Sequence, residues 1–315
     1  MQRYFISRVI QSLLVLAGVL MMVFFMMHLT GDPAGLMASR NASPEEIARL
    51  RDQMGLNRPM TIQFFEFAID VLSGDFGNST RYHQPAMDLI LERLPATVEL
   101  ASISLFISMI IGIPLGLLGG SNPNSMVDYL ARGAGLFGQT VPNFWLALIL
   151  ILVFGLHLGW FPTFGRETWR FMGLTLPTRS VFLPACSLSL FTLGQLARFT
   201  RSAVMEVRSE DYILTARSKG LSVRRIYIQH ILRNASIPLI SIVGVQFGYL
   251  LSGSIYIETI FSWPGLGNLL ADAIGNRDFA LVQGIAFFSS FVVVILNLLT
   301  DMAYATADPR VRYGE

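Results

Sequence analysis

The amino-acid sequence predicts an all-α membrane protein with six transmembrane helices, and two observations carry this prediction. Of the 315 residues, 53% are hydrophobic and only 14% are charged, whereas soluble domains carry about a quarter charged residues. The mean hydropathy is +0.54. In addition, six segments have the length and apolar character that a bilayer-spanning helix needs. These segments are residues 9–29, 98–120, 130–158, 181–199, 239–260 and 281–304.

The distribution of basic residues predicts the topology. Arg3 and Arg8 precede the first span, so the N-terminus should be cytoplasmic. A signal peptide is the competing interpretation, but the apolar run is long and no cleavage site is obvious after Thr30. Eight basic residues surround the loop between spans four and five, which should therefore also be cytoplasmic. They are Arg198, Arg201, Arg208, Arg217, Lys219, Arg224, Arg225 and Arg233.

Six spans that start inside also end inside, and the tail carries Arg310 and Arg312. Three arginines, Arg166, Arg170 and Arg179, oppose this topology because they fall in a loop that it places outside. The chain then divides into an N-terminus with the first span (1–29), an extracytoplasmic helical region (30–96), a core of five spans (97–304) and a cytoplasmic tail (305–315).

The extracytoplasmic region should contain two helices. Ser43 is a typical N-cap residue, Pro44 suits the first helical position, and Gly55 would end the helix. A second helix is expected over residues 61–72. The region is too small to form a second domain and should lie on the membrane face.

The cytoplasmic loop, residues 205–236, is the most informative segment. A short helix is expected over 212–219, ended by Gly220, followed by a second helical run over 223–234 and by Pro238 at the next span. Tyr212, Ala216 and Gly220 would allow a partner to approach closely. Arg217 and Lys219 could meet carboxylates or carbonyl groups on it. The alternative is a basic loop that only fixes topology and touches lipid headgroups.

Glycines at four-residue spacing predict close helix packing rather than substrate contact. They are Gly112, Gly116 and Gly120 in the second span, and Gly244 and Gly248 in the fifth. Pro114, Pro142 and Pro184 should each loosen the backbone bonding of a span, as suits a bundle around a passage.

Signatures of catalysis are missing from the sequence. It has no phosphate-binding Gly-x-x-x-x-Gly-Lys-Ser/Thr loop, no Gly-x-Ser-x-Gly elbow and no His-Glu-x-x-His pair. The four histidines are far apart, so a metal site is not expected, and Cys186 is expected to be a small buried side chain. The basic residues flank spans, which does not indicate nucleic-acid binding. We therefore expect a non-catalytic chain without a cofactor of its own.

Ionisable residues within the spans are few and lie near their ends: Glu99, Arg198, Glu258 and Asp301. A proton- or sodium-driven carrier would usually need a charge nearer the middle of the bilayer. This pattern disfavours a stand-alone secondary carrier or channel, which remains the alternative from a different class, with a membrane scaffold third.

Motifs along nearly the whole chain resemble the membrane permeases of bacterial ABC importers, in the dipeptide/oligopeptide/nickel transport family, first-permease type. They lie in the 30–96 region, at the openings of spans two and three, in the cytoplasmic loop and before span six. The sequences are Gly31-Asp-Pro33, Met54-Gly-Leu56, Gly74-Asp-Phe-Gly-Asn-Ser79, Arg93-Leu-Pro-Ala-Thr-Val-Glu-Leu100, Val141-Pro-Asn-Phe-Trp145, Glu210-Asp-Tyr212, Thr215-Ala-Arg217, Lys219-Gly220, Leu232-Arg-Asn-Ala235, Glu258-Thr-Ile-Phe-Ser-Trp-Pro-Gly-Leu-Gly267 and Arg277-Asp278.

The resemblance implies the type I ABC importer permease fold in the bacterial inner membrane. It also implies the partners: a second homologous permease, two cytoplasmic ATPases that bind ATP and Mg, an extracytoplasmic solute-binding protein, and membrane lipids. The family's Glu-Ala-Ala, three residues, Gly pattern ends at Gly220, but Leu214-Thr-Ala216 fills its first positions. Glu210 precedes them by four residues and could lie on the same helix face.

By this resemblance, the residues that couple the chain to an ATPase are Glu210, Asp211, Tyr212, Thr215, Ala216, Arg217, Lys219 and Gly220. Residues expected to dock the binding protein or form a gate are Asp75, Trp263, Pro264, Gly265 and Gly267. The cargo would be a dipeptide or short oligopeptide. A nickel chelate, glutathione, an opine or another small solute stays open.

Overall fold

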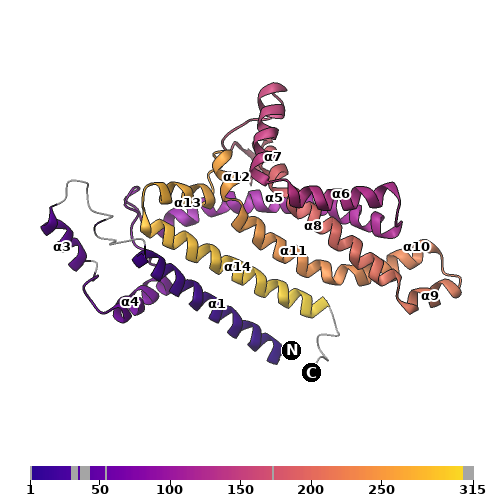
Figure 1. Cartoon of the computed structure of the whole chain (residues 1–315), viewed down its shortest axis with the longest axis horizontal. Coiled ribbons are helices and arrows are strands. Elements are labelled where there is room, and N and C mark those ends of the chain that lie inside the picture. Colours follow the sequence, from indigo (N-terminus) through magenta and orange to yellow (C-terminus); the bar gives the residue numbers. More distant parts are fainter. Residues whose placement is uncertain (1, 30–34, 36–42, 54, 172–173, 308–315) are drawn as a thin grey trace.

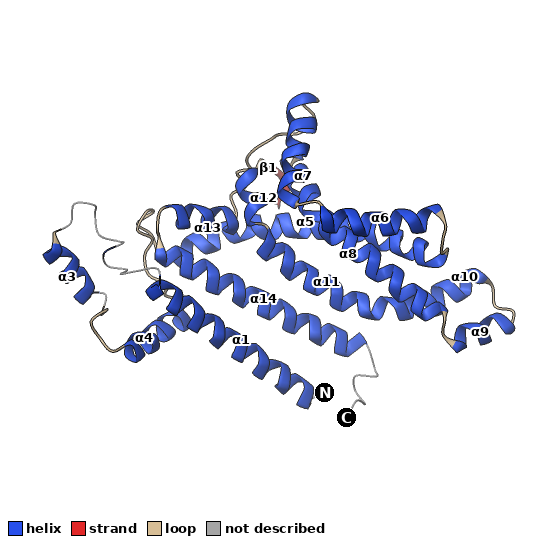
Figure 2. Cartoon of the chain, in the orientation of Figure 1, coloured by secondary structure: helices blue, strands red, loops and turns tan. Residues whose placement is uncertain are grey.

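The computed structural model describes residues 2–29, 35, 43–53, 55–171 and 174–307, and this part of the chain is mainly helical (Figure 2). Four helices are long and apolar enough to cross a membrane: α1 (Gln2–Leu29), α5 (Ala86–Ser121), α8 (Phe182–Arg208) and α14 (Phe279–Ala307). Two bent pairs pass the same test together. The described chain therefore has between four and six membrane spans, and six if each bent pair is one span.

The long helices lie side by side and place distant loops at two ends of the bundle (Figure 1). α1 begins and α14 ends on the side that carries α9 (Asp211–Ser218) and α10 (Val223–Ile226). There the Nε of Arg8 lies 3.2 Å from a carboxylate oxygen of Asp301. The opposite side carries α3 (Pro44–Gln53), α4 (Met60–Ser73), α12 (Ile255–Ile260) and α13 (Leu266–Gly275). We call these the α9 end and the α13 end.

The two helices expected in the region before α5 are confirmed. The Ser43 hydroxyl accepts from the Glu46 N–H at 3.2 Å, and the Glu46 carboxylate accepts from the Ser43 N–H at 2.8 Å, which forms a capping box before α3. Gly55 and Gly74 follow α3 and α4 with positive φ values of 66° and 84°. Gly31 to Pro33, Met54, Arg310 and Arg312 lie outside the described residues.

The second span begins earlier than expected. α5 starts at Ala86 and runs through Pro95 and Pro114 without a break, so the boundary drawn at residue 96 lies inside a continuous helix. Pro184 lies in the first turn of α8, where a missing N–H costs no helical hydrogen bond. The expectation that Pro184 loosens this span is therefore wrong.

The third expected span, 130–158, is not one straight helix. α6 (Met126–Thr140) ends before Val141 and Pro142, which are both extended. α7 (Asn143–Leu150) then continues as the π-helical turn η1 (Ile151–His157), at 99° to α6. Proline lacks an N–H and forces the residue before it out of helical geometry, so Pro142 breaks the helix instead of kinking it.

One small antiparallel hairpin follows this bend and departs from an all-α chain. β1 (Thr168–Phe171) pairs with β2 (Leu174–Pro177), with Thr168 opposite Pro177 and Phe171 opposite Leu174. The turn η2 (Arg179–Val181) then leads into α8. Arg166, one of the arginines that opposed the topology, lies in this loop and donates from Nε to the Glu99 carboxylate of α5 at 3.0 Å. Its charge is thus balanced within the chain.

The loop between spans four and five, residues 205–236, also differs from expectation after Gly220. Instead of ending near Asn234, the second helical run continues from α10 through the π-helical turn η3 (Tyr227–Leu232) into α11 (Arg233–Gly253). Pro238 lies inside this run, at a bend of 43°. The main apolar core joins α5, α7, α8, α11 and α12, with Leu100, Leu188 and Leu250 fully buried in it.

Candidate functional site

The short helix expected in the loop is present as α9, and its end is sharply defined. Gly220 follows it with φ +75°, a conformation that favours glycine. The Leu221 N–H donates to the Ala216 carbonyl at 3.3 Å, and the Gly220 N–H donates to the Arg217 carbonyl at 2.9 Å. This is a Schellman motif, so the backbone of α9 is closed at its C-terminus without any partner.

α9 is fastened to the bundle by its buried face. Ile213 and Ala216 pack in an apolar cluster with Val204 of α8, Ile226 of α10, Ile231 and Ala235. Ala216 is only 6% exposed. The expectation that Ala216 faces a partner is therefore wrong: its small side chain lets α9 approach its own bundle. A movement of α9 must then be shared with α8 and α11.

The opposite face of α9 is open. Its exposed residues mix both charges around an apolar tip: Glu210, Asp211, Tyr212, Leu214, Thr215, Arg217, Lys219 and Gly220. The Tyr212 hydroxyl accepts from the Asn234 amide at 3.0 Å, which fixes the ring on α11. Leu214 is 69% exposed and was not among the expected site residues. The sequence did contain a signal for this exposure. Successive side chains of a helix point about 100° apart, so Leu214 points away from the face on which Ile213 is buried.

Glu210 was expected one helical turn before Leu214, on the same helix face. It is the N-cap residue of α9, with an extended backbone at φ −69° and ψ 141° and no side-chain capping bond. Its carbonyl accepts from the Ile213 N–H at 3.0 Å, so the first turn begins at Glu210, but its own backbone is not helical. A carboxylate there is still favourable, because the N-terminus of a helix attracts negative charge.

α8 leads into α9 and is the stem that carries it, and this stem packs closely against α5. Glycines of α5 lie against the α8 backbone: a Cβ at Gly112 would lie 2.7 Å from the Leu193 carbonyl oxygen, and one at Gly120 would lie 2.8 Å from that of Arg201. Between them, Gly116 meets Ala197 in the same way. Arg208, at the end of α8, donates to the last carbonyls of α5, those of Gly120 and Ser121, at 2.7 and 2.5 Å.

A buried carboxylate holds α6 on the same stem, and sequence reasoning missed it. Asp128, fully buried in the first turn of α6, binds the guanidinium of Arg201 on α8. Arg132 donates to it at 2.7 Å and the Asn124 N–H at 2.9 Å. In α11, Gly244 lies against the Thr300 side chain, and a Cβ at Gly248 would lie 3.5 Å from Val293 of α14.

At the α13 end, the segment expected to dock a partner is largely inside the protein. Trp263 is fully buried, and its Nε1–H donates to the Ala96 carbonyl at 2.8 Å. Gly265 and Gly267 are buried, and Pro264 is half-buried. The expectation that Trp263 presents a docking face is therefore wrong in this structure, because the indole fills the junction of α5 and α12.

Glu258, a fully buried carboxylate on α12, binds the segment around Trp263 into the protein. It accepts from the Thr97 hydroxyl at 2.8 Å, from the Gly267 N–H at 2.7 Å and from the Asn268 N–H at 3.2 Å. The Leu266 N–H donates to the Thr97 hydroxyl oxygen at 2.8 Å. A carboxylate at the N-terminus of α13 thus satisfies the free amides of that helix, and Gly265 and Gly267 leave room for it.

Asp75 remains exposed at this end. Its Oδ1 accepts from the Gly77 N–H at 2.8 Å in the loop before α5. The same loop is tied to α14 by Ser79, whose hydroxyl donates to buried Asp278 at 2.5 Å. Among the residues that the structure describes, no three His, Cys, Asp or Glu side chains are grouped so as to hold a metal ion.

Comparisons with known proteins match the whole length of the chain. Residues 112–313 match the family described as binding-protein-dependent transport system inner membrane component, and residues 1–101 match the N-terminal component of the same system. A peptide transport system permease protein of Brucella abortus is 41% identical, covering 98% of each chain. The oligopeptide transport system permease protein AppB of Bacillus subtilis is 37% identical, over 99% of this chain and all of that one.

A third relative is the glutathione transport system permease protein GsiC of Salmonella typhimurium, which is 36% identical over 99% of this chain and all of GsiC. Among solved structures, an inward-facing form of the MetNI methionine ABC transporter has a chain that matches with a TM-score of 0.55. The match has 17% identity and covers 70% of this chain and 97% of that one. At that identity the match supports the fold.

Proposed function

Since the chain belongs to the family of binding-protein-dependent transport system inner membrane components, and is a permease subunit of an ABC importer, we propose that it carries short peptides across the inner membrane. The relatives from Brucella abortus and Bacillus subtilis, whose names specify peptide and oligopeptide transport, support this cargo. Glutathione, itself a short peptide, is the second candidate, because GsiC matches over nearly the same length.

The proposed assembly has four kinds of partner. A second homologous permease completes the passage, two cytoplasmic ATPases bind ATP and Mg, and an extracytoplasmic binding protein delivers cargo. The α9 end faces the cytoplasm, together with both termini, and the α13 end faces outward. The placement of the start of α1 and the end of α14 on the side of α9 supports this orientation (Figure 1).

The observation that carries the proposal is the two-sided character of α9. Its inner face, Ile213 and Ala216, joins the apolar cluster that also holds α8 and α11, while Leu214 projects from the outer face among charged residues. On a helix whose other face is held rigidly by the bundle, this apolar side chain could enter a pocket of a partner while the charged residues around it form the polar rim of the contact. Closure of the ATPases would push α9, and the locked stem α8–α5 would pass the movement to the passage. The two states must differ in such contacts for ATP to shift between them.

The decisive experiment measures ATP hydrolysis by the purified complex in lipid, with and without its binding protein, across dipeptides, longer peptides, glutathione and nickel chelates. Stimulation by peptides supports the proposed cargo. Stimulation by glutathione alone would favour the second candidate. Uptake by this chain in vesicles that contain no ATPase would overturn the importer mechanism in favour of a carrier.

The Leu214→Asp substitution tests the docking face. Because Leu214 is largely exposed, the stability of the permease should change by less than about 0.5 kcal/mol. Cargo-stimulated ATP hydrolysis should fall at least about tenfold, as expected for a lost interface anchor. Leu214→Met, which keeps an apolar tip, is the matched control and should retain activity. Equal activity of both variants would contradict the docking role.

A further inference from the structure

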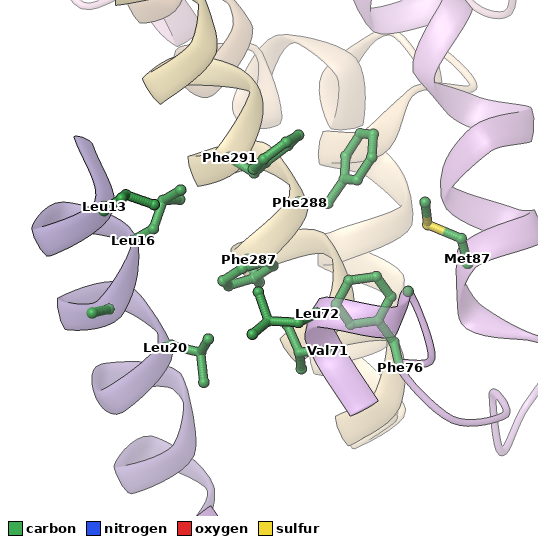
Figure 3. A pocket seen from close by; sticks show the side chains of 12 residues that line it. Leu13, Leu16, Leu20, Val71, Leu72, Phe76, Met87, Phe287, Phe288 and Phe291 are labelled. Carbon is green, nitrogen blue, oxygen red and sulfur yellow. The ribbon is translucent and has the colours of Figure 1, made fainter. Parts of the chain in front are cut away.

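An apolar pocket lies between α1, α4 and α14, near the middle of α1 (Figure 3). Its volume is about 450 Å³. Leu13, Leu16 and Leu20 of α1 form one wall, Phe287 of α14 points toward them, and Phe288 and Phe291 line the pocket along α14, with Phe288 on the side of Met87. Residues of α4, the following loop and the start of α5 close the remaining side. The family's transport function does not account for this pocket.

The lining of the pocket excludes polar occupants. Its side chains are aliphatic or aromatic, apart from the thioether of Met87. A buried water needs two or more polar partners, and a peptide placed here would leave its amide groups without hydrogen bonds. An empty pocket of this size would forfeit the dispersion contacts of all its walls. The pocket therefore suits an apolar molecule.

The pocket is closed at its floor and open at its rim. Leu20, Val71 and Phe287 form the floor and are each less than 9% exposed. Leu13, Leu72 and Phe291 lie at the rim with 60%, 76% and 41% of their surface exposed. α1 and α14 both qualify as membrane spans and bury little of their surface in this chain. The rim is therefore continuous with a surface that meets the hydrocarbon of the bilayer.

Contacts at both ends of α1 keep the pocket from collapsing. At one end Arg8 pairs with Asp301 of α14. At the other, His28 Nε2 and the Gln63 side-chain oxygen of α4 are 3.1 Å apart, and Phe24 packs edge-on against Phe64. Since α1 is held at both ends and also packs on Val71 and Phe287 through Leu20, the pocket beside these contacts cannot close, and its occupant must come from outside the chain.

The dimensions favour an acyl chain over a helix from another subunit. A helix is about 10–12 Å across and rises 5.4 Å per turn, so the pocket holds roughly the volume of one turn. A spanning helix could send only side chains into it, whereas a lipid tail is narrow, flexible and abundant at the rim. We propose that the pocket between α1, α4 and α14 binds an acyl chain of a bilayer lipid. The acyl chain then fills the space that the side chains of α1, α4 and α14 leave open.

A fluorescent reporter in the pocket wall tests this proposal. Phe288 lines the pocket and is only partly exposed, so the Phe288→Trp reporter would sense an occupant more than the open bilayer. The assembled complex is placed in bilayers of phosphatidylcholine with brominated acyl chains, which quench tryptophan on contact. The signal of the parent complex is subtracted. We expect strong quenching of the reporter.

A second substitution distinguishes the pocket from the bilayer at large. Ala17→Phe should fill the pocket and remove at least half of the reporter's quenching. Leu14→Phe lies on the same helix but does not line the pocket, and it should leave the quenching unchanged. An unquenched reporter in the assembled complex would mean that a protein subunit covers the site and would overturn the proposal. Quenching that Ala17→Phe does not reduce would overturn it equally.

Discussion

Two segments at opposite ends of the bundle, α12–α13 and α9, are held in place in different ways. At the α13 end, a buried carboxylate, Glu258, gathers the Thr97 hydroxyl and two backbone amides, and the indole of Trp263 donates inward to Ala96. α9 is held by an apolar contact, through Ile213 and Ala216, and its charged side chains remain exposed. The first segment therefore buries its polar groups within the chain, and the second leaves its charged groups at the surface.

The difference shows where the chain fixes its own geometry. Buried hydrogen bonds are directional and costly to leave unmade, so they hold α12, α13 and α5 in one arrangement. An apolar cluster is less directional, and it holds α9 on α8 and α11 without using the charged groups of α9. The predictions below test this contrast, from the largest expected effect to the smallest.

Glu258→Ala should have the largest effect. Three donors would lose their acceptor in a buried site, which costs about 3 kcal/mol or more. The melting temperature of the purified permease should fall by roughly 10 °C. Glu206→Ala, at an exposed position near the α9 end, is the control and should shift it by less than about 2 °C. Similar melting temperatures for both variants would contradict the claim that the buried hydrogen bonds of Glu258 hold α12, α13 and α5 together.

Gly116→Ala tests the stem between the two ends. A Cβ there would lie 2.6 Å from the Thr200 Cβ and would also meet the Ala197 carbonyl. Forcing α5 from α8 should cost about 1–3 kcal/mol, measured as a lower melting temperature. Gly133→Ala is the matched control, because a Cβ at Gly133 meets nothing within 4 Å. The control should be neutral or slightly stabilising, since glycine weakens helices. An unchanged Gly116→Ala variant would show that the two helices are not held this closely.

Gly220→Val should have the smallest effect on stability but should clearly reduce uptake. No atom lies within 4 Å of a Cβ at Gly220, so the cost is the left-handed backbone alone, about 1–2 kcal/mol for an ordinary residue. Gly220→Asn should be milder, because asparagine tolerates this conformation. We expect uptake to fall several-fold for valine and to stay near the parent level for asparagine, with the complex intact. Equal losses for both would instead indicate that a partner needs the space at Gly220.

Patterns of local chemistry allowed much of the fold to be predicted. The Ser43 cap, the glycine ends at Gly55 and Gly220, and the short helix between Glu210 and Gly220 were all expected from neighbouring residues, and the structure contains them. Such features depend on contacts within a few positions, so the sequence carries their full signal. The membrane class followed from composition, and the family from motifs spread along the chain.

The sequence by itself determined the membrane class, most of the long helices and the position of α9. Tertiary structure alone decided which way residues face and what they bind: Ala216 and Trp263 turn inward, Leu214 turns outward, and Asp128 meets Arg201 across 73 positions. It also set the angle of 99° between α6 and α7, whereas the break between them follows from Pro142 itself. These outcomes depend on which helices become neighbours, and contacts between distant segments leave no local pattern in a single sequence.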